Sequence, residues 1–153
     1  MVPALPPGVP VPLREVPAPL LLELSVETVA AGFPSPADDY VDASIDLNVE
    51  LIPCPTATFF MRVEGDSMRG DGICDGDLLV IDRSVLPRAG LVVVAVLAGR
   101  FVLRHLVRSA HGLSLVASDG QTPGVLLTDD EDSSIWGVVI HAIHHLSGSP
   151  ARR

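Results

Sequence analysis

Residues 90–109, GLVVVAVLAGRFVLRHLVRS, decide the fold class of this chain. The first half is almost wholly apolar and rich in valine, which is typical of a strand buried on both faces. The second half alternates apolar and polar residues, as a strand with one buried face does. Because the two halves are joined by the short turn AGR, we expect them to pair as a β-hairpin.

The strand pattern continues on both sides of this hairpin. We expect further strands at TATFFMRVEG (56–65), DGDLLVIDR (75–83), HGLSLVAS (111–118) and SSIWGVVIHAIHHL (133–146). Short strands with turn residues between them predict an all-β domain, a compact small barrel or a sandwich.

The N-terminal third has a different composition. Residues 1 to about 20 contain seven prolines and no regular period, so they predict an extended, partly polyproline arm. Residues 21–31 could form a short helix or a strand, and the prolines and aspartates of residues 32–48 predict a loop. The expected organisation is a proline-rich arm (1–31), a linker (32–55), a β domain (56–146) and a disordered tail (147–153).

Composition and charge exclude several classes of protein. The chain is 48% hydrophobic and 19% charged, which is not the profile of a disordered protein. Its formal net charge of −9 opposes contact with phosphate backbones, so we expect no direct nucleic-acid binding. Two cysteines are too few for a disulfide framework, and the N-terminus lacks a basic region and a membrane-length apolar run. We therefore expect a cytoplasmic protein that makes no contact with membranes.

One serine lies on a glycine-flanked turn, in EGDSMRG (64–70). Ser67 could be a nucleophile, but a serine needs a base to accept its proton. Five histidines are available, and nothing in their spacing singles one out. The alternative is an ordinary turn serine that bonds to nearby backbone groups.

Two patterns invite a metal ion, and both are weak. On the expected strand, His141 and His145 share one face and His144 points to the other. No cysteine or carboxylate lies close to them in sequence. Residues 71–82 have aspartates at EF-hand spacing, but Ile73 cannot be a ligand. We therefore expect no metal site and no cofactor.

Five blocks of the sequence resemble the LexA/UmuD family of self-cleaving proteins, serine peptidase family S24. They are AGFPSPADDYVD (31–42), IDLN (45–48), GDSM (65–68), DGDLLVID (75–82) and WGVVIH (136–141), and they occur in order with few gaps. The resemblance implies a compact β domain with a long N-terminal arm that holds the cleavage site. Because about thirty proline-rich residues cannot form a helix-turn-helix domain, the chain resembles the UmuD branch rather than the repressors.

The resemblance implies three functional positions. The cleavage site falls on Ala31–Gly32, the nucleophile on Ser67, and the family's general-base lysine on Arg104. A lysine can be neutral in a buried site and accept the serine proton, whereas an arginine guanidinium stays protonated. All ten basic residues are arginine, so no lysine can replace it. His105 is adjacent, but it would share a face with Arg104 only if a bulge shifted the register.

The family also implies a function and partners. By resemblance the chain is a homodimeric subunit of an error-prone translesion polymerase in the SOS response to DNA damage. Its partners would be a Y-family, UmuC-like polymerase subunit and a RecA-type recombinase filament that stimulates self-cleavage. The alternative is a pseudo-peptidase that keeps the fold and the partner surfaces but cannot cleave because of Arg104. We expect self-cleavage to be absent or slow. The five matching blocks disfavour a third reading, a β-barrel without an active site.

Overall fold

A computed structural model of the chain describes residues 7–13, 21–25, 31–32, 41–129 and 132–147. The chain divides into two compact units, one of Glu15–Pro53 and one of Met1–Arg14 together with Cys54–Arg153. Each unit is described by itself. No helix in the described part of the chain is long and apolar enough to cross a membrane.

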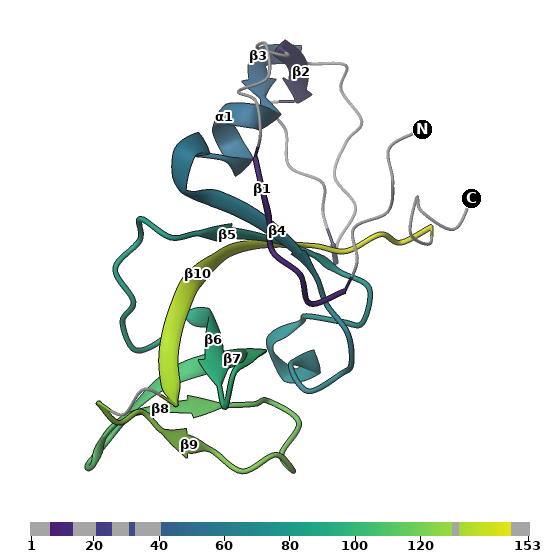
Figure 1. Cartoon of the computed structure of the whole chain (residues 1–153). Helices are drawn as coiled ribbons and strands as arrows, with labels where there is room; N and C mark the ends of the chain where they lie inside the picture. Colours follow the sequence, from purple (N-terminus) through teal and green to yellow (C-terminus); the bar gives the residue numbers. More distant parts are fainter. Residues whose placement is uncertain (1–6, 14–20, 26–30, 33–40, 130–131, 148–153) are drawn as a thin grey trace. The chain divides into compact units, whose positions relative to one another are not determined.

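The larger unit contains an antiparallel sheet, which has eight strands within the described residues (Figure 1). The strand order is β1-β4-β5-β10-β6-β7-β8-β9. The strands are β1 (Val11–Pro12), β4 (Thr58–Arg62), β5 (Leu78–Asp82), β6 (Val92–Leu97), β7 (Arg100–Ser109), β8 (Gly112–Val116), β9 (Val125–Leu126) and β10 (Ser133–Ile143). The predicted all-β class is confirmed, and the sheet is open, with β1 and β9 at its edges.

The predicted central hairpin is present as β6 and β7. Its pairing runs without interruption from Val92 opposite His105 to Leu97 opposite Arg100. The middle of β6 is fully buried, and its residues alternate between two core clusters, with Val94 in one and Val93 and Ala95 in the other. The apolar run therefore faces packed side chains on both sides, as its composition predicts.

The hairpin turn carries a strained residue. Ala98 has φ +48° and Gly99 has φ +75°, so both central residues of the two-residue turn are left-handed. Glycine and asparagine tolerate this conformation better than alanine. We expect Ala98→Asn to raise the free energy of unfolding by about 0.5–1 kcal/mol, measured by urea denaturation. A destabilised variant would contradict the assignment of strain to this position.

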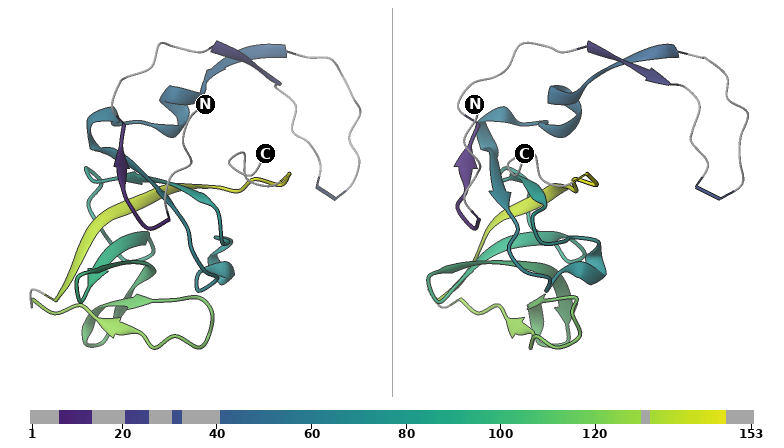
Figure 2. Two further views of the ribbon diagram at one scale, coloured as in Figure 1. Left: turned by 45° about the vertical axis from the view of Figure 1, so that its right-hand side comes forward. Right: turned by 90° about the vertical axis from the view of Figure 1, so that its right-hand side faces the viewer.

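Strand β10 joins the two halves of the sheet, because it pairs with β5 on one side and with β6 on the other. Its register shifts between Ile135 and Gly137 and again between Val139 and His141. Such irregularities bend a strand, and β10 follows a long curve in both views of Figure 2. One end of β10 therefore continues past β5, close to the residues that precede β5.

The expected loop over residues 32–48 is wrong for residues 41–48, which form a strand and the start of a helix in the smaller unit. Within it, β3 (Val41–Asp46) pairs antiparallel with β2 (Leu21–Ser25), and α1 (Leu47–Leu51) follows directly. Residues 41–46, VDASID, do alternate apolar and polar side chains, a strand signal masked by the prolines and aspartates just before them. The Asp46 side chain accepts a hydrogen bond from the Asn48 amide (2.9 Å) and so caps the helix.

Two very short strands, β1 and β9, were not expected from the sequence. In β1, Val11 lies opposite Phe60 and Pro12 opposite Phe59, at the edge of the sheet where a proline is tolerated. A pattern of two residues is too short to show a period. Residues 1–6 and 14–20 of the predicted arm, and 148–153 of the predicted tail, lie outside the described residues.

Candidate functional site

Ser67 lies in the connection between β4 and β5, just before the 3₁₀ turn η2 (Arg69–Asp71). Its neighbour Met68 is 1% exposed and packs in the core cluster that also contains Met61 and Ile81. The serine itself is partly exposed. The buried methionine therefore anchors the turn and leaves the serine at the surface.

The turn that holds Ser67 is also hydrogen-bonded to Ser118, which lies just after β8. The Ser118 amide donates to the Ser67 carbonyl (2.9 Å), and Ser118 Oγ accepts from the Asp71 amide (3.1 Å). A Cβ atom added to Gly70 would lie 2.5 Å from the Ser118 carbonyl oxygen. A side chain at position 70 would push the turn away from Ser118, so the glycine is required by close approach.

Arg104 reaches Ser67 from β7. Its Nη1 donates to Ser67 Oγ at 3.4 Å and to the Leu103 carbonyl oxygen at 2.7 Å. The structure thus brings together the two site residues that the resemblance implies. A guanidinium group only donates hydrogen bonds, so this contact does not remove the serine proton.

His105, the other candidate base, lies against a different side chain. The β6–β7 ladder is continuous through Val93 opposite Arg104 and Val92 opposite His105, so the bulge that His105 would need is absent here. His105 Nδ1 instead lies 3.3 Å from Asp71 Oδ1. No hydrogen bond joins His105 to Ser67 in the described part of the chain.

A cavity of about 180 Å³ opens beside the serine. It lies between the residues after β4 and the first half of β7. Its lining residues are Val63, Glu64, Gly65, Ser67, Met68, Phe101, Val102, Leu103 and Arg104. A second cavity of similar size shares five of these residues and is also lined by Gly8, Met61, Arg62, Leu79 and Val94. The serine therefore lies at one end of a longer depression.

Within the described residues, one wall of this depression is a strand edge that pairs with no other strand. Leu106 exchanges hydrogen bonds with Gly90 and Leu91 on the β6 side. Backbone groups alternate along an antiparallel strand, so those of Leu103 point away from β6. Strand β8 covers that side only from His105 onward. Such an edge can accept an extended peptide as an added strand.

The serine turn carries further polar groups. Within the described residues, the amides of Ser67 and Met68 donate no hydrogen bond. The Asp66 carboxylate pairs with Arg69 at 2.9 Å. This hydrogen bond, followed by the charge of Asp66, raises the pKa of Arg69 above its ordinary value.

The implied cleavage site, Ala31–Gly32, belongs to the smaller unit. Both residues are exposed and lie outside its strands.

The structure also assembles a cluster that the sequence analysis missed. His144 follows β10, and its Nδ1 lies 2.5 Å from Asp77 Oδ1, while Cys74 is beside both. His144 has no cysteine or carboxylate close to it in sequence, but Cys74 and Asp77 lie close to it in space. The antiparallel pairing of β5 with β10 brings these residues together.

Comparison with known proteins gives a consistent result. A family model described as Peptidase S24-like matches residues 23–140. Protein ImpA of Salmonella typhimurium is 40% identical over 121 residues, covering 79% of this chain and 82% of the relative. Protein SamA of Salmonella typhimurium strain LT2 is 39% identical over 79% of this chain and 84% of its own length. Protein MucA of Escherichia coli is 35% identical over 77% of this chain and 81% of its own length.

The open all-β sheet is consistent with the fold of the peptidase S24 family. The matches to the family model and to the three relatives identify the family more specifically than the fold does. The chain belongs to the peptidase S24 family, and within that family it is a UmuD-like protein of SOS mutagenesis.

Proposed function

We propose that the protein acts as a UmuD-like partner subunit of an error-prone Y-family polymerase and that its own self-cleavage is absent or very slow. The observation that carries the second part is the contact of Arg104 Nη1 with Ser67 Oγ. Arg104, which lies next to the nucleophile position, stays protonated and only donates hydrogen bonds. The reaction needs a proton acceptor there. In this reading the protein is a pseudo-peptidase that works through binding.

The position of the guanidinium gives a second reason for slow cleavage. Arg104 also donates to the Leu103 carbonyl oxygen, on the unpaired edge of β7. A peptide that adds to this edge would need the same carbonyl group. Arg104 therefore competes with substrate binding as well as lacking the base function.

The second candidate is a working self-cleaving protein, in which Ser67 attacks the Ala31–Gly32 bond. Three features of the described residues favour it: a partly exposed serine, two turn amides that donate no hydrogen bond there, and a cavity bordered by a strand edge without a described partner strand. In that mechanism the amides of Ser67 and Met68 would stabilise the oxyanion, and Arg104 could only contribute charge. Removal of the base from such a set of residues slows the reaction by several orders of magnitude.

One assay separates the two candidates. The full chain is incubated with an activated recombinase–DNA filament, and separately at alkaline pH, and mass spectrometry follows the loss of residues 1–31. We expect the chain to stay intact over hours. Rapid cleavage that Ser67→Ala abolishes would establish the second candidate instead. Co-purification with a Y-family polymerase tests the subunit role independently, because both candidates require it.

A further inference from the structure

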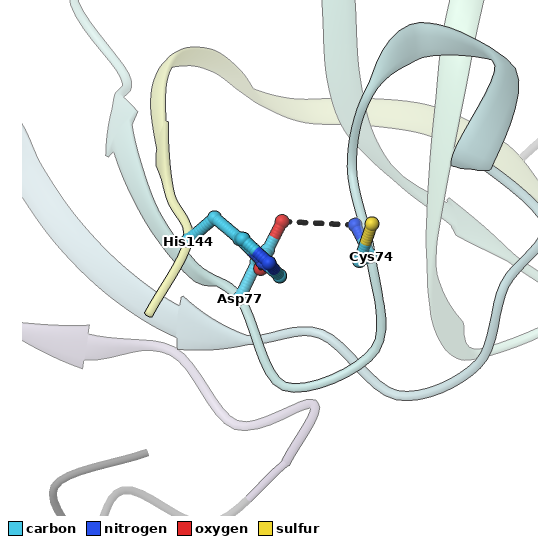
Figure 3. Close-up of side chains that lie close together, drawn as sticks. All are labelled: Cys74, Asp77 and His144. Atoms are coloured by element: carbon cyan, nitrogen blue, oxygen red, sulfur yellow. Dashed lines mark hydrogen bonds and ion pairs between the residues drawn. The ribbon is translucent and has the colours of Figure 1, made fainter. Parts of the chain in front are cut away.

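Three side chains of the types that bind zinc meet at the C-terminal end of β10, apart from the serine site. They are Cys74, Asp77 and His144, and their ligand atoms all lie within 4.8 Å of one another (Figure 3). The contacts described for Ser67 and Arg104 involve none of them. We propose that this cluster binds a Zn²⁺ ion.

The local fold explains how the cluster arises. Residues 74–77, CDGD, form a tight turn in which the Asp77 amide donates to the Cys74 carbonyl (3.1 Å), and Gly76 has φ +86°. Cys74 and Asp77 have the spacing of two ligands on one turn of a zinc site, with an aspartate where a second cysteine is more usual. In the β5–β10 ladder, Ile143 lies opposite Leu78, so the next residue of each strand end, His144 and Asp77, are neighbours.

The hydrogen bonds already orient the carboxylate as a ligand. Asp77 is 1% exposed, and its Oδ2 accepts from the Cys74 amide at 2.8 Å. Its Oδ1 faces His144 Nδ1 at 2.5 Å. With Oδ2 held by the backbone, Oδ1 would be the ligand atom once the contact with His144 opens to admit the ion, and the Cys74 amide would act as the outer partner that fixes the carboxylate.

The distances require only small side-chain movements. In a tetrahedral zinc site the ligand atoms lie roughly 3.3–3.8 Å apart. The Asp77–His144 contact is shorter than this spacing, and the remaining separations reach at most 4.8 Å. Entry of the ion would therefore widen the first contact by about 1 Å and draw the thiol inward. The His144 side chain is 49% exposed, which leaves the fourth position to a water molecule.

The ligand types select the metal. A thiolate together with an imidazole favours zinc over calcium or magnesium, which prefer oxygen ligands. The thiol must release its proton to bind, and the resulting thiolate and carboxylate charges would be balanced by a divalent cation. A simple Asp77–His144 ion pair would account for two of the three side chains and would give the cysteine no role.

Zinc at this position would connect the serine turn to the end of the sheet. The segment from Met68 to Asp77 is already compact, because the Met68 carbonyl accepts from the amides of Asp71 (3.1 Å) and Ile73 (3.2 Å). An ion held by Cys74, Asp77 and His144 would fasten the far end of this segment to β10. Binding should therefore stabilise the folded β unit.

The test uses the reduced, metal-free full chain with Co²⁺ and Zn²⁺ as probes. We expect Co²⁺ to bind at one equivalent, with a thiolate-to-cobalt charge-transfer band and visible d–d bands that Zn²⁺ removes. Free Zn²⁺ at about a hundred times its Kd should raise the thermal midpoint by roughly 5–10 °C. Absence of the charge-transfer band, with no rise in the thermal midpoint, would overturn the proposal.

Matched variants locate the site. Cys74→Ser should remove the charge-transfer band, and His144→Ala, at a half-exposed position, should weaken binding at least about tenfold. Cys54→Ser and His111→Ala change the same residue types outside the cluster and should bind like the parent. Retention of the band in Cys74→Ser, or its loss in Cys54→Ser, would refute the assignment.

Discussion

Arg104→Lys is expected to switch on self-cleavage at Ala31–Gly32, with a rate at least about 10²–10⁴ times that of the parent chain. The guanidinium of Arg104 lies 3.4 Å from Ser67 Oγ, so a side chain at this position already reaches the hydroxyl. A lysine there can lose its proton when a bound peptide excludes water, and it can then accept the proton of Ser67. The measurement is mass spectrometry of the 32–153 fragment over a range of pH.

Three variants make this result specific. Arg104→Lys combined with Ser67→Ala should not cleave, because the nucleophile is missing. Arg104→Gln removes the charge without adding a base and should stay inactive. Arg108→Lys places a lysine at an exposed position of the same strand and should also be inactive. An unchanged rate in Arg104→Lys would show that the missing base is not what limits cleavage.

The larger elements of the fold could be predicted because their patterns are local. The hairpin of β6 and β7 follows from a valine run, an alternating run and a two-residue turn, all within residues 90–109. Strands β4, β5, β8 and β10 follow from short apolar-rich runs with turn residues between them. The positions Ser67 and Arg104 came from the resemblance to a family, and the structure places their side chains in contact.

The contacts that complete the site depend on register between distant strands, which no local pattern shows. Ser118 supports the serine turn only because β8 ends beside it. His105 faces Asp71 only because the register of β7 against β6 does not shift between Leu103 and His105. His144 meets Asp77 only because β10 shifts its register after Val139 and then pairs to the end of β5. A shift of one residue in the strand register would break each of these contacts. The sequence alone therefore does not predict them.

The second large effect concerns Met68, the residue that anchors the serine turn. Its side chain is 1% exposed and packs in a core cluster with Met61, Ile73 and Leu79. Truncation of a buried methionine to alanine removes apolar contacts and leaves a cavity, which costs about 2–5 kcal/mol. We therefore expect Met68→Ala to lower the free energy of unfolding by this amount, a large share of the roughly 5–15 kcal/mol of a typical domain.

Two matched variants separate core packing from effects of the turn itself. Met68→Leu keeps the buried volume and should cost less than about 1.5 kcal/mol. Arg69→Ala changes the next residue, whose side chain is 68% exposed and pairs with Asp66, and should cost less than about 1 kcal/mol. Urea denaturation of the three variants measures these differences. If Met68→Ala destabilised the protein no more than Arg69→Ala does, that result would show that core packing of Met68 does not hold the serine turn. The hydrogen bonds between the turn and Ser118 would then be what holds it.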